Sequence, residues 1–491
     1  MSWVFRVLHK KGLTSLPVLG PVPQNFMTSQ LKPLEERNRV ISYADDLKPA
    51  ITTMEEFTLV NDASAMFEAA SGCRLHRDPA SQKCKFLPLG KWRRQLEQKD
   101  LPEACQYFVL SGHLDMVGVQ LRATWTQTRK ANGDIVQQRV SNTINPWRGG
   151  KFMALTMRPG SVNNFALSKV WFRCGSVDLR ESDIFAINSS VKSWMYADLW
   201  QKPSEVVMCR PQSYGGLGVY SVKYKAQALL TRTFLETAVP NFRHSLLHSI
   251  MFRFHVLGDT SVPNPGYLPY YPPSFFDTIK RVHADTPHDV TTMSIKHWVQ
   301  ILTEDCLTME VVESKRFKLC KAEVCSPNTD WQLSWMICRL PGLGSELTSF
   351  NFKLLHKLLV SRERLHQLTP ATSPLCSLCS RENEDLMHAL INCDFNNNVG
   401  NTLLNLIKLY VPSLTGPSLL RLELTNLPEE KLFSVTFFTS TILKTIWDKR
   451  MAKSKISSYE VRTTLEAKCI LLRKTRFVSQ VPILKELLTY L

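Results

Sequence analysis

Four residues in the last third of the chain have the types and spacing of a metal site. Cys376, Cys379, His388 and Cys393 form the pattern C-x2-C-x8-H-x4-C. Zn²⁺ prefers thiolate and imidazole ligands, and a close cysteine pair can present two thiolates from one knuckle turn. Because four protein ligands leave no open coordination position, we expect a structural zinc ion that contributes directly to local folding. The alternative is a set of reduced, unligated cysteines beside an unrelated histidine.

Two adjacent aspartates, Asp45 and Asp46, form a second candidate site. Val40, Ile41 and Tyr43 before them are strand formers, so the sequence predicts a hairpin with the aspartates at its tip. Carboxylate oxygens bind hard cations such as Mg²⁺. Nucleotidyl transfer on two metal ions needs carboxylates from more than one segment, so this pair cannot form the whole site. An isolated Asp-Asp pair is otherwise ordinary turn chemistry.

The last fifty residues form a third candidate site, because they are strongly basic. Residues 440–491 carry an excess of seven positive charges when Lys and Arg are set against Asp and Glu. Lys and Arg supply most contacts to nucleic-acid phosphates without reading sequence. We therefore expect a phosphate-contacting surface here, with Lys449, Arg450, Lys453 and Lys455 as its candidate residues. The alternative is a solvated helical face.

The composition of the whole chain agrees with a polyanionic partner. The 491 residues carry a net charge of +17 and have a pI near 9.3, which favours nucleic acid or an anionic membrane surface. Apolar runs are too short to span a bilayer, and the first 20 residues lack the apolar core of a secretory signal. Thirteen scattered cysteines do not resemble a secreted disulfide framework. We therefore expect an intracellular protein, nuclear or cytoplasmic, with no membrane partner.

Capping residues, glycines and prolines along the chain predict mixed α and β structure toward the N-terminus and mainly helices toward the C-terminus. Thr53 can cap a helix with Glu56 three residues later, and Gly72 would stop it. A helical stretch is expected after the turn at Gly215 to Gly218, and the proline-rich Pro263 to Pro273 reads as a linker or surface loop. We therefore divide the chain into five predicted segments: 1–110, 111–240, 241–340 (linker-rich), 341–400 (helix and zinc knuckle) and 401–491 (basic and helical).

Several short sequence motifs resemble motifs of non-LTR (LINE-type) retrotransposon reverse transcriptases, and they occur in the same order along the chain. Ile41 to Asp46 is similar to the YADD signature, and Phe67 to Gly72 is similar to the F-x-x-x-S-G that ends the next helix in those enzymes. Ile144 to Phe172 and Pro211 to Leu235 resemble segments behind the polymerase. The Cys/His group from Cys376 to Cys393 resembles a motif that follows the reverse transcriptase in many LINE elements.

The resemblance implies an α+β fold in which a partial polymerase palm precedes a thumb-like region and a zinc knuckle. It also implies RNA-directed DNA synthesis with Mg²⁺ at Asp45 and Asp46, Zn²⁺ at the knuckle, and RNA and DNA as partners. The family carries a further catalytic aspartate upstream, whereas no aspartate precedes Asp45 here. We therefore expect this chain by itself to be inactive as a polymerase. The alternatives are a non-catalytic, zinc-containing nucleic-acid-binding protein derived from a retroelement, and a relic without function.

Overall fold

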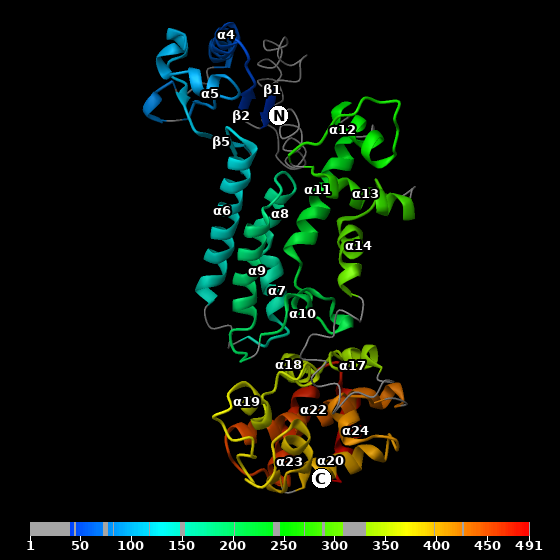
Figure 1. The fold of residues 1–491 in the computed structure, drawn as a ribbon. Coiled ribbons are helices and arrows are strands. Elements are labelled where there is room, and N and C mark those ends of the chain that lie inside the picture. The colour runs from blue at the N-terminus through cyan, green and yellow to red at the C-terminus, as the bar shows by residue number, and fades with distance from the viewer. Residues whose placement is uncertain are drawn as a thin grey trace. The chain divides into compact units, whose positions relative to one another are not determined.

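The computed structural model describes most of the chain and is mostly helical, with a few short strands (Figure 1). At this coarse level it is compatible with the predicted α+β class. The described residues are 40–43, 46–71, 77–81, 83–116, 118–147, 153–200, 202–238, 246–269, 271–286, 290–307, 330–396, 398–424 and 427–490. The chain divides into two compact units. The first comprises Met1–Thr143, Ala166–Asn188 and Ser221–Thr303, and the second comprises Ile144–Phe165, Ser189–Tyr220 and Glu304–Leu491.

The first unit begins with the hairpin that the sequence predicts. Strands β1 (Val40–Tyr43) and β2 (Asp46–Pro49) are antiparallel, and Tyr43 pairs with Asp46. Helix α4 (Met54–Ser71) follows, and the Thr53 hydroxyl accepts the Glu56 N–H at 3.4 Å, as the predicted cap requires. In a capping box the Glu56 carboxylate would accept the N–H of the cap residue, Thr53. Here it accepts the N–H of the preceding residue, Thr52, at 2.6 Å.

The middle of the first unit holds short strands followed by longer helices. The strands are β3 (Lys85–Phe86), β4 (Val109–Leu110), β5 (His113–Met116) and β6 (Val119–Arg122); β3 pairs with β4 in parallel, and β5 with β6 antiparallel. The helices are α5 (Trp92–Gln95), α6 (Trp125–Ile144), α8 (Ser168–Cys174), α11 (Val222–Ala238) and the first half of α9 (Glu181–Met195), whose residues from Ser189 onward belong to the second unit. Helix α11 confirms the helical stretch predicted after the glycine-rich turn.

The region predicted to be linker-rich supplies a large part of the first unit's core. Helices α12 (Leu246–Met251), α13 (Pro273–Asp285) and α14 (Ile295–Leu307) lie there. Phe275, Phe276 and Trp298 from these helices pack in one apolar cluster with Phe234 of α11. The predicted loop is confirmed for the described residues 263–269 and 271–272, which are mostly exposed and outside any helix. Pro273 itself occupies the first turn of α13, where its missing N–H has no intrahelical partner to lose.

The second unit is an assembly of helices around one buried helix. Its helices are α7 (Arg158–Ser161), α10 (Glu205–Cys209), α17 (Trp331–Ile337), α18 (Gly344–Leu355), α19 (Arg362–Leu368), α20 (Val399–Lys408), α21 (Gly416–Leu420), α22 (Glu429–Met451), α23 (Ser458–Leu472) and α24 (Val481–Leu488). Helix α22 contacts α18, α20, α23 and α24, and every residue from Ser434 to Leu443 is buried. No helix among the described residues is long and apolar enough to cross a membrane.

Candidate metal centre

The knuckle turn brings Cys376 and Cys379 together at the end of a short hairpin-like segment. Leu375 bridges to Asn383, and the Cys376 N–H donates to the carbonyl of Glu382 at 2.8 Å. The turn closes when the Ser380 N–H donates to the Cys376 carbonyl at 2.9 Å, with Ser380 in the left-handed region at φ 56°. This backbone places both thiols on the same side of the turn.

The second pair of ligands comes from the start and end of a short helix. His388 opens the single π-turn η11 (His388–Asn392), and Cys393 follows it directly. The Asp385 carboxylate accepts the His388 N–H at 2.6 Å and so fixes where this turn begins. The sequence prediction that a short helix carries His388 and Cys393 to the cysteine pair is confirmed.

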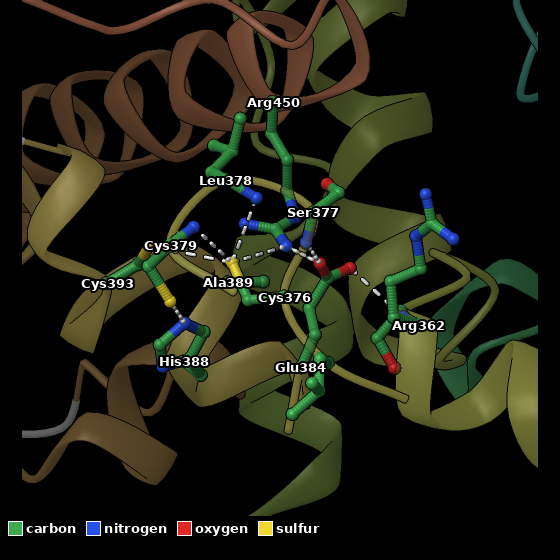
Figure 2. A network of polar contacts seen from close by, with 12 residues as sticks. Arg362, Cys376, Ser377, Leu378, Cys379, Glu384, His388, Ala389, Cys393 and Arg450 are labelled. Carbon is green, nitrogen blue, oxygen red and sulfur yellow. Dashed lines mark hydrogen bonds and ion pairs between the residues drawn. The ribbon is translucent and has the colours of Figure 1, made fainter. Parts of the chain in front are cut away.

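The four candidate ligands converge on one small region (Figure 2). Their ligand atoms all lie within 4.8 Å of one another. The Sγ atoms of Cys376 and Cys393 are 3.8 Å apart, and Cys379 Sγ is 3.3 Å from His388 Nε2. A tetrahedral ion with bonds of about 2.3 Å to sulfur and about 2.0 Å to nitrogen separates such atoms by roughly 3.5 to 3.8 Å. The cluster can therefore hold a metal ion such as zinc.

A carboxylate orients the histidine for metal binding. His388 Nδ1 lies 2.9 Å from Oε2 of Glu382, so Nδ1 carries the proton and donates it in this bond. Nε2 is thereby left with its lone pair directed toward the cysteine sulfurs. A carboxylate on the far nitrogen of a metal-binding histidine fixes the ring and raises its basicity. Glu382 is thus part of the centre, although the sequence prediction did not include it.

The thiols of the cluster differ in their surroundings. Burial opposes ionisation of Cys376, but the N–H groups of Cys379 and Leu378 point at its sulfur, at 3.3 and 3.4 Å, and lower the pKa of this thiol. Burial raises the pKa of the Cys393 thiol, and the nearby sulfur of Cys376 raises it further. A cation at the centre would favour the thiolate form of all three cysteines, since thiolate is the form that binds metal.

Behind the cluster lies a buried ion pair that joins it to α22. Arg450 reaches from α22 to Glu384 and forms an ion pair with its carboxylate, and its guanidinium also donates to Cys376 Sγ at 3.5 Å (Figure 2). Both side chains are almost fully buried: Arg450 is 4% exposed and Glu384 is 3% exposed. The prediction that Arg450 contacts nucleic acid is wrong for this structure, because its charge faces the interior.

The other predicted phosphate contacts lie at or near the surface. Lys449 is half-buried and pairs with Glu460 at 2.5 Å. Lys453 and Lys455 are exposed, and the Lys455 ammonium lies 4.9 Å from the centre of the Phe395 ring. Phe395 comes two residues after the candidate ligand Cys393, so Lys455 lies near the metal centre.

The aspartate pair cannot be placed in full. Asp45 lies outside the described residues, and of Asp46 only the backbone is described, as the first residue of β2. Because Tyr43 pairs with Asp46, a two-residue connection joins the strands, which agrees with the hairpin predicted from the sequence. Magnesium binding by Asp45 and Asp46 stays a prediction.

Sequence reasoning missed the residues that support the ligands. Glu382, Glu384 and Asp385 all lie between Cys379 and His388, and each accepts a hydrogen bond that orders the centre. Three carboxylates in the short interval between two candidate ligands could have indicated these supporting residues, since groups that orient metal ligands are commonly acidic. Arg450 gives no comparable local signal, because it lies in a helix remote in sequence.

Comparison with known proteins adds no family to this description. No protein-family model matches the chain, and no curated protein matches it.

Proposed function

We propose that this chain is the carboxy-terminal part of a LINE-type RNA-directed DNA polymerase, and that its second unit binds nucleic acid around a structural zinc ion. The observation that carries the proposal is the Cys376, Cys379, His388 and Cys393 cluster, with ligand atoms within 4.8 Å of one another. The YADD-like motif, which lies N-terminal to the cluster, is part of a two-stranded hairpin, and this supports the resemblance to LINE-type reverse transcriptases.

Zinc is the ion that best fits this donor set. Three sulfurs and one imidazole are soft and borderline ligands, which suit Zn²⁺ and disfavour Mg²⁺ or Ca²⁺. With four protein ligands the site is closed, so its role is to hold the knuckle in place rather than to activate water. At Asp45 and Asp46 the resemblance implies Mg²⁺ bound by carboxylate oxygens.

A second candidate function is a non-catalytic, zinc-containing nucleic-acid-binding protein derived from a retroelement. The exposed Lys453, and Lys455 near the centre, favour it, as does a recess of about 430 Å³ between α23 and α24. Three cations, Arg462, Arg473 and Lys485, line this recess. Both candidates have the same basic surface, and they differ in whether the hairpin belongs to a working polymerase.

The experiment that tests nucleic-acid binding uses charge reversal at residues that the structure leaves exposed. We expect the chain to bind duplex DNA with little sequence preference. If about five phosphates are neutralised, log affinity falls against log salt with a slope of about −4 to −5. Changing Lys453→Glu with Lys455→Glu is expected to weaken binding to every sequence alike and to reduce the slope by about 2.

The matched control reverses two exposed lysines of the first unit, Lys280→Glu with Lys296→Glu, which changes net charge equally. Fluorescence anisotropy at several salt concentrations measures all three proteins. If the Lys453 and Lys455 variant kept the affinity and slope of the parent, these lysines would be a solvated face and nucleic-acid binding here would be rejected.

A further inference from the structure

The buried ion pair between Arg450 and Glu384 lies directly beside the metal cluster. A buried ion pair generally contributes no more stability than apolar side chains of the same volume, because both charges must leave water. Here, however, the Arg450 guanidinium also donates to the sulfur of a candidate ligand, Cys376, at 3.5 Å. We propose that Arg450 is a positioning residue of the metal centre, which orients the Cys376 thiolate and fastens the knuckle to α22.

Glu384 makes this fastening possible, because its carboxylate joins three segments. Oε1 accepts the N–H of Arg362, the first residue of α19, at 3.0 Å. Oε2 accepts the N–H of Ser377, inside the knuckle turn, at 3.2 Å, and also forms the ion pair with Arg450. One buried carboxylate therefore holds α19, the metal-binding turn and α22 in a fixed relation.

The charge of the loaded centre, together with the Glu384 carboxylate, favours a cation at this place. Three thiolates around a divalent ion leave one excess negative charge in a buried site, and burying a charge without a partner is costly. The guanidinium brings a positive charge to Cys376 Sγ. Both contacts run from one guanidinium nitrogen, Nη2, whose two hydrogens can donate to the sulfur and to the carboxylate.

The proposal predicts that the metal affinity depends on Arg450 even though Arg450 is no ligand. Removing a residue that orients a metal ligand typically lowers affinity roughly ten- to a hundredfold. We expect Arg450→Met to weaken zinc binding by that factor, and Arg450→Lys to weaken it as well, because the shorter lysine side chain does not carry its ammonium to the place of Nη2. In Co²⁺-loaded protein, the thiolate-to-metal absorption band is expected to shift in both variants, since the donor bond to Cys376 is lost.

A second arginine in the same unit provides the control. Arg421 pairs with Glu423 at 2.6 Å, and the two side chains are 7% and 13% exposed; Arg421 also donates to the Ser418 hydroxyl at 3.3 Å. Arg421→Met therefore removes a comparably buried ion pair and is expected to leave zinc affinity and the Co²⁺ band unchanged. Affinity is measured on the full chain by competition with a chromophoric chelator.

The outcomes separate this inference from the proposed function on which it rests. A parent protein that takes up no zinc or cobalt would overturn the structural zinc site itself. If the parent binds metal and Arg450→Met binds it equally tightly with the same Co²⁺ band, the role of Arg450 is refuted while the zinc site stands. An equal loss in Arg421→Met would also refute it, since the effect would then be general destabilisation. Should Arg450→Met not fold, Arg450→Lys decides by the same two measurements.

Discussion

At the scale of single residues, the candidate metal ligands come from one short stretch, and Cys376 and His388 each have their own supporting contacts. The N–H groups of Leu378 and Cys379 point at the Cys376 sulfur, and Glu382 orients His388. These contacts are local, so the C-x2-C-x8-H-x4-C spacing alone was enough to predict which four side chains meet. The spacing could not show Arg450, because that contact depends on how α22 packs against the knuckle.

We expect about one zinc ion per chain, lost when two ligands are removed. Changing Cys376→Ser with Cys379→Ser should abolish metal binding and unfold the knuckle, because the ion supplies folding free energy to a structural site. Elemental analysis measures the metal, and amide hydrogen exchange across residues 374–396 measures the unfolding. Cys469→Ser, at a buried non-ligand cysteine of the same unit, is expected to retain the metal. Full metal content in the double variant would contradict the assignment.

A second residue-scale prediction concerns acid stability and His356. Burial lowers the pKa of His356 to about 4, although its Nε2 bonds the carbonyl of Gly215 at 2.6 Å. The unfolded chain has a histidine pKa near 6.5, so between pH of about 6.5 and about 4 only the unfolded state takes up the proton. Stability contributed by neutral His356 is therefore complete above pH of about 6.5 and is lost as the pH falls toward 4, by roughly 3 kcal/mol.

The variant His356→Gln isolates this contribution, because glutamine keeps a donor for Gly215 and does not titrate. Acid-induced metal loss is shared by both proteins and cancels in the comparison. Hydrogen exchange in α18, measured at pH 7 and pH 4.5, reports the local free energy of opening. We expect a steeper loss of protection in the parent than in the variant; equal losses would show that His356 is not the titrating group.

At the scale of elements, α22 is the helix on which the second unit is built. It contains buried Phe437, Phe438 and Ile442, but also four buried hydroxyls for which no described residue offers a hydrogen-bond partner. These belong to Thr436, Thr439, Ser440 and Thr441. A hydroxyl without a partner in the interior costs free energy, whereas small side chains let neighbouring helices approach closely.

We therefore expect Thr436→Val to stabilise the second unit by about 1 kcal/mol, because valine has nearly the same shape and no polar atom to bury. Thr445→Val on the same helix is the control, since the Thr445 hydroxyl donates to the Thr441 carbonyl at 2.8 Å and would lose that bond. Denaturant unfolding measures both variants. A lower midpoint for Thr436→Val would mean that its hydroxyl has a partner after all.

The sequence could predict those elements that depend mainly on residues close to them in the chain. The cap at Thr53, the helix after the turn at Gly215 to Gly218 and the hairpin around Asp45 depend on neighbouring residues, and they were predicted. The core helix α13 was not, because its place in the core depends on the packing of Phe275 and Phe276 with Phe234 of α11. Tertiary packing decides such cases, and no local pattern contains it.

At the scale of the whole molecule, the YADD-like hairpin and the metal centre fall in different compact units. We expect the 491 residues, expressed by themselves, not to extend a primer on an RNA template, since two-metal nucleotidyl transfer needs carboxylates beyond Asp45 and Asp46. Incorporation of dNTPs with Mg²⁺ or Mn²⁺ is the measurement. Activity that disappears in an Asp45→Ala, Asp46→Ala variant would contradict this expectation and show a complete site.

The contact between Glu384 and Arg450 also constrains how related sequences can diverge. Replacing one partner alone leaves a buried charge uncompensated, at a cost of about 3 to 5 kcal/mol, whereas replacing both with apolar residues can be nearly neutral. Intermediate sequences with a single replacement should therefore be rare. Among future relatives, positions 384 and 450 are expected to covary as acid with base or to become apolar together, even where the surrounding surface has drifted freely.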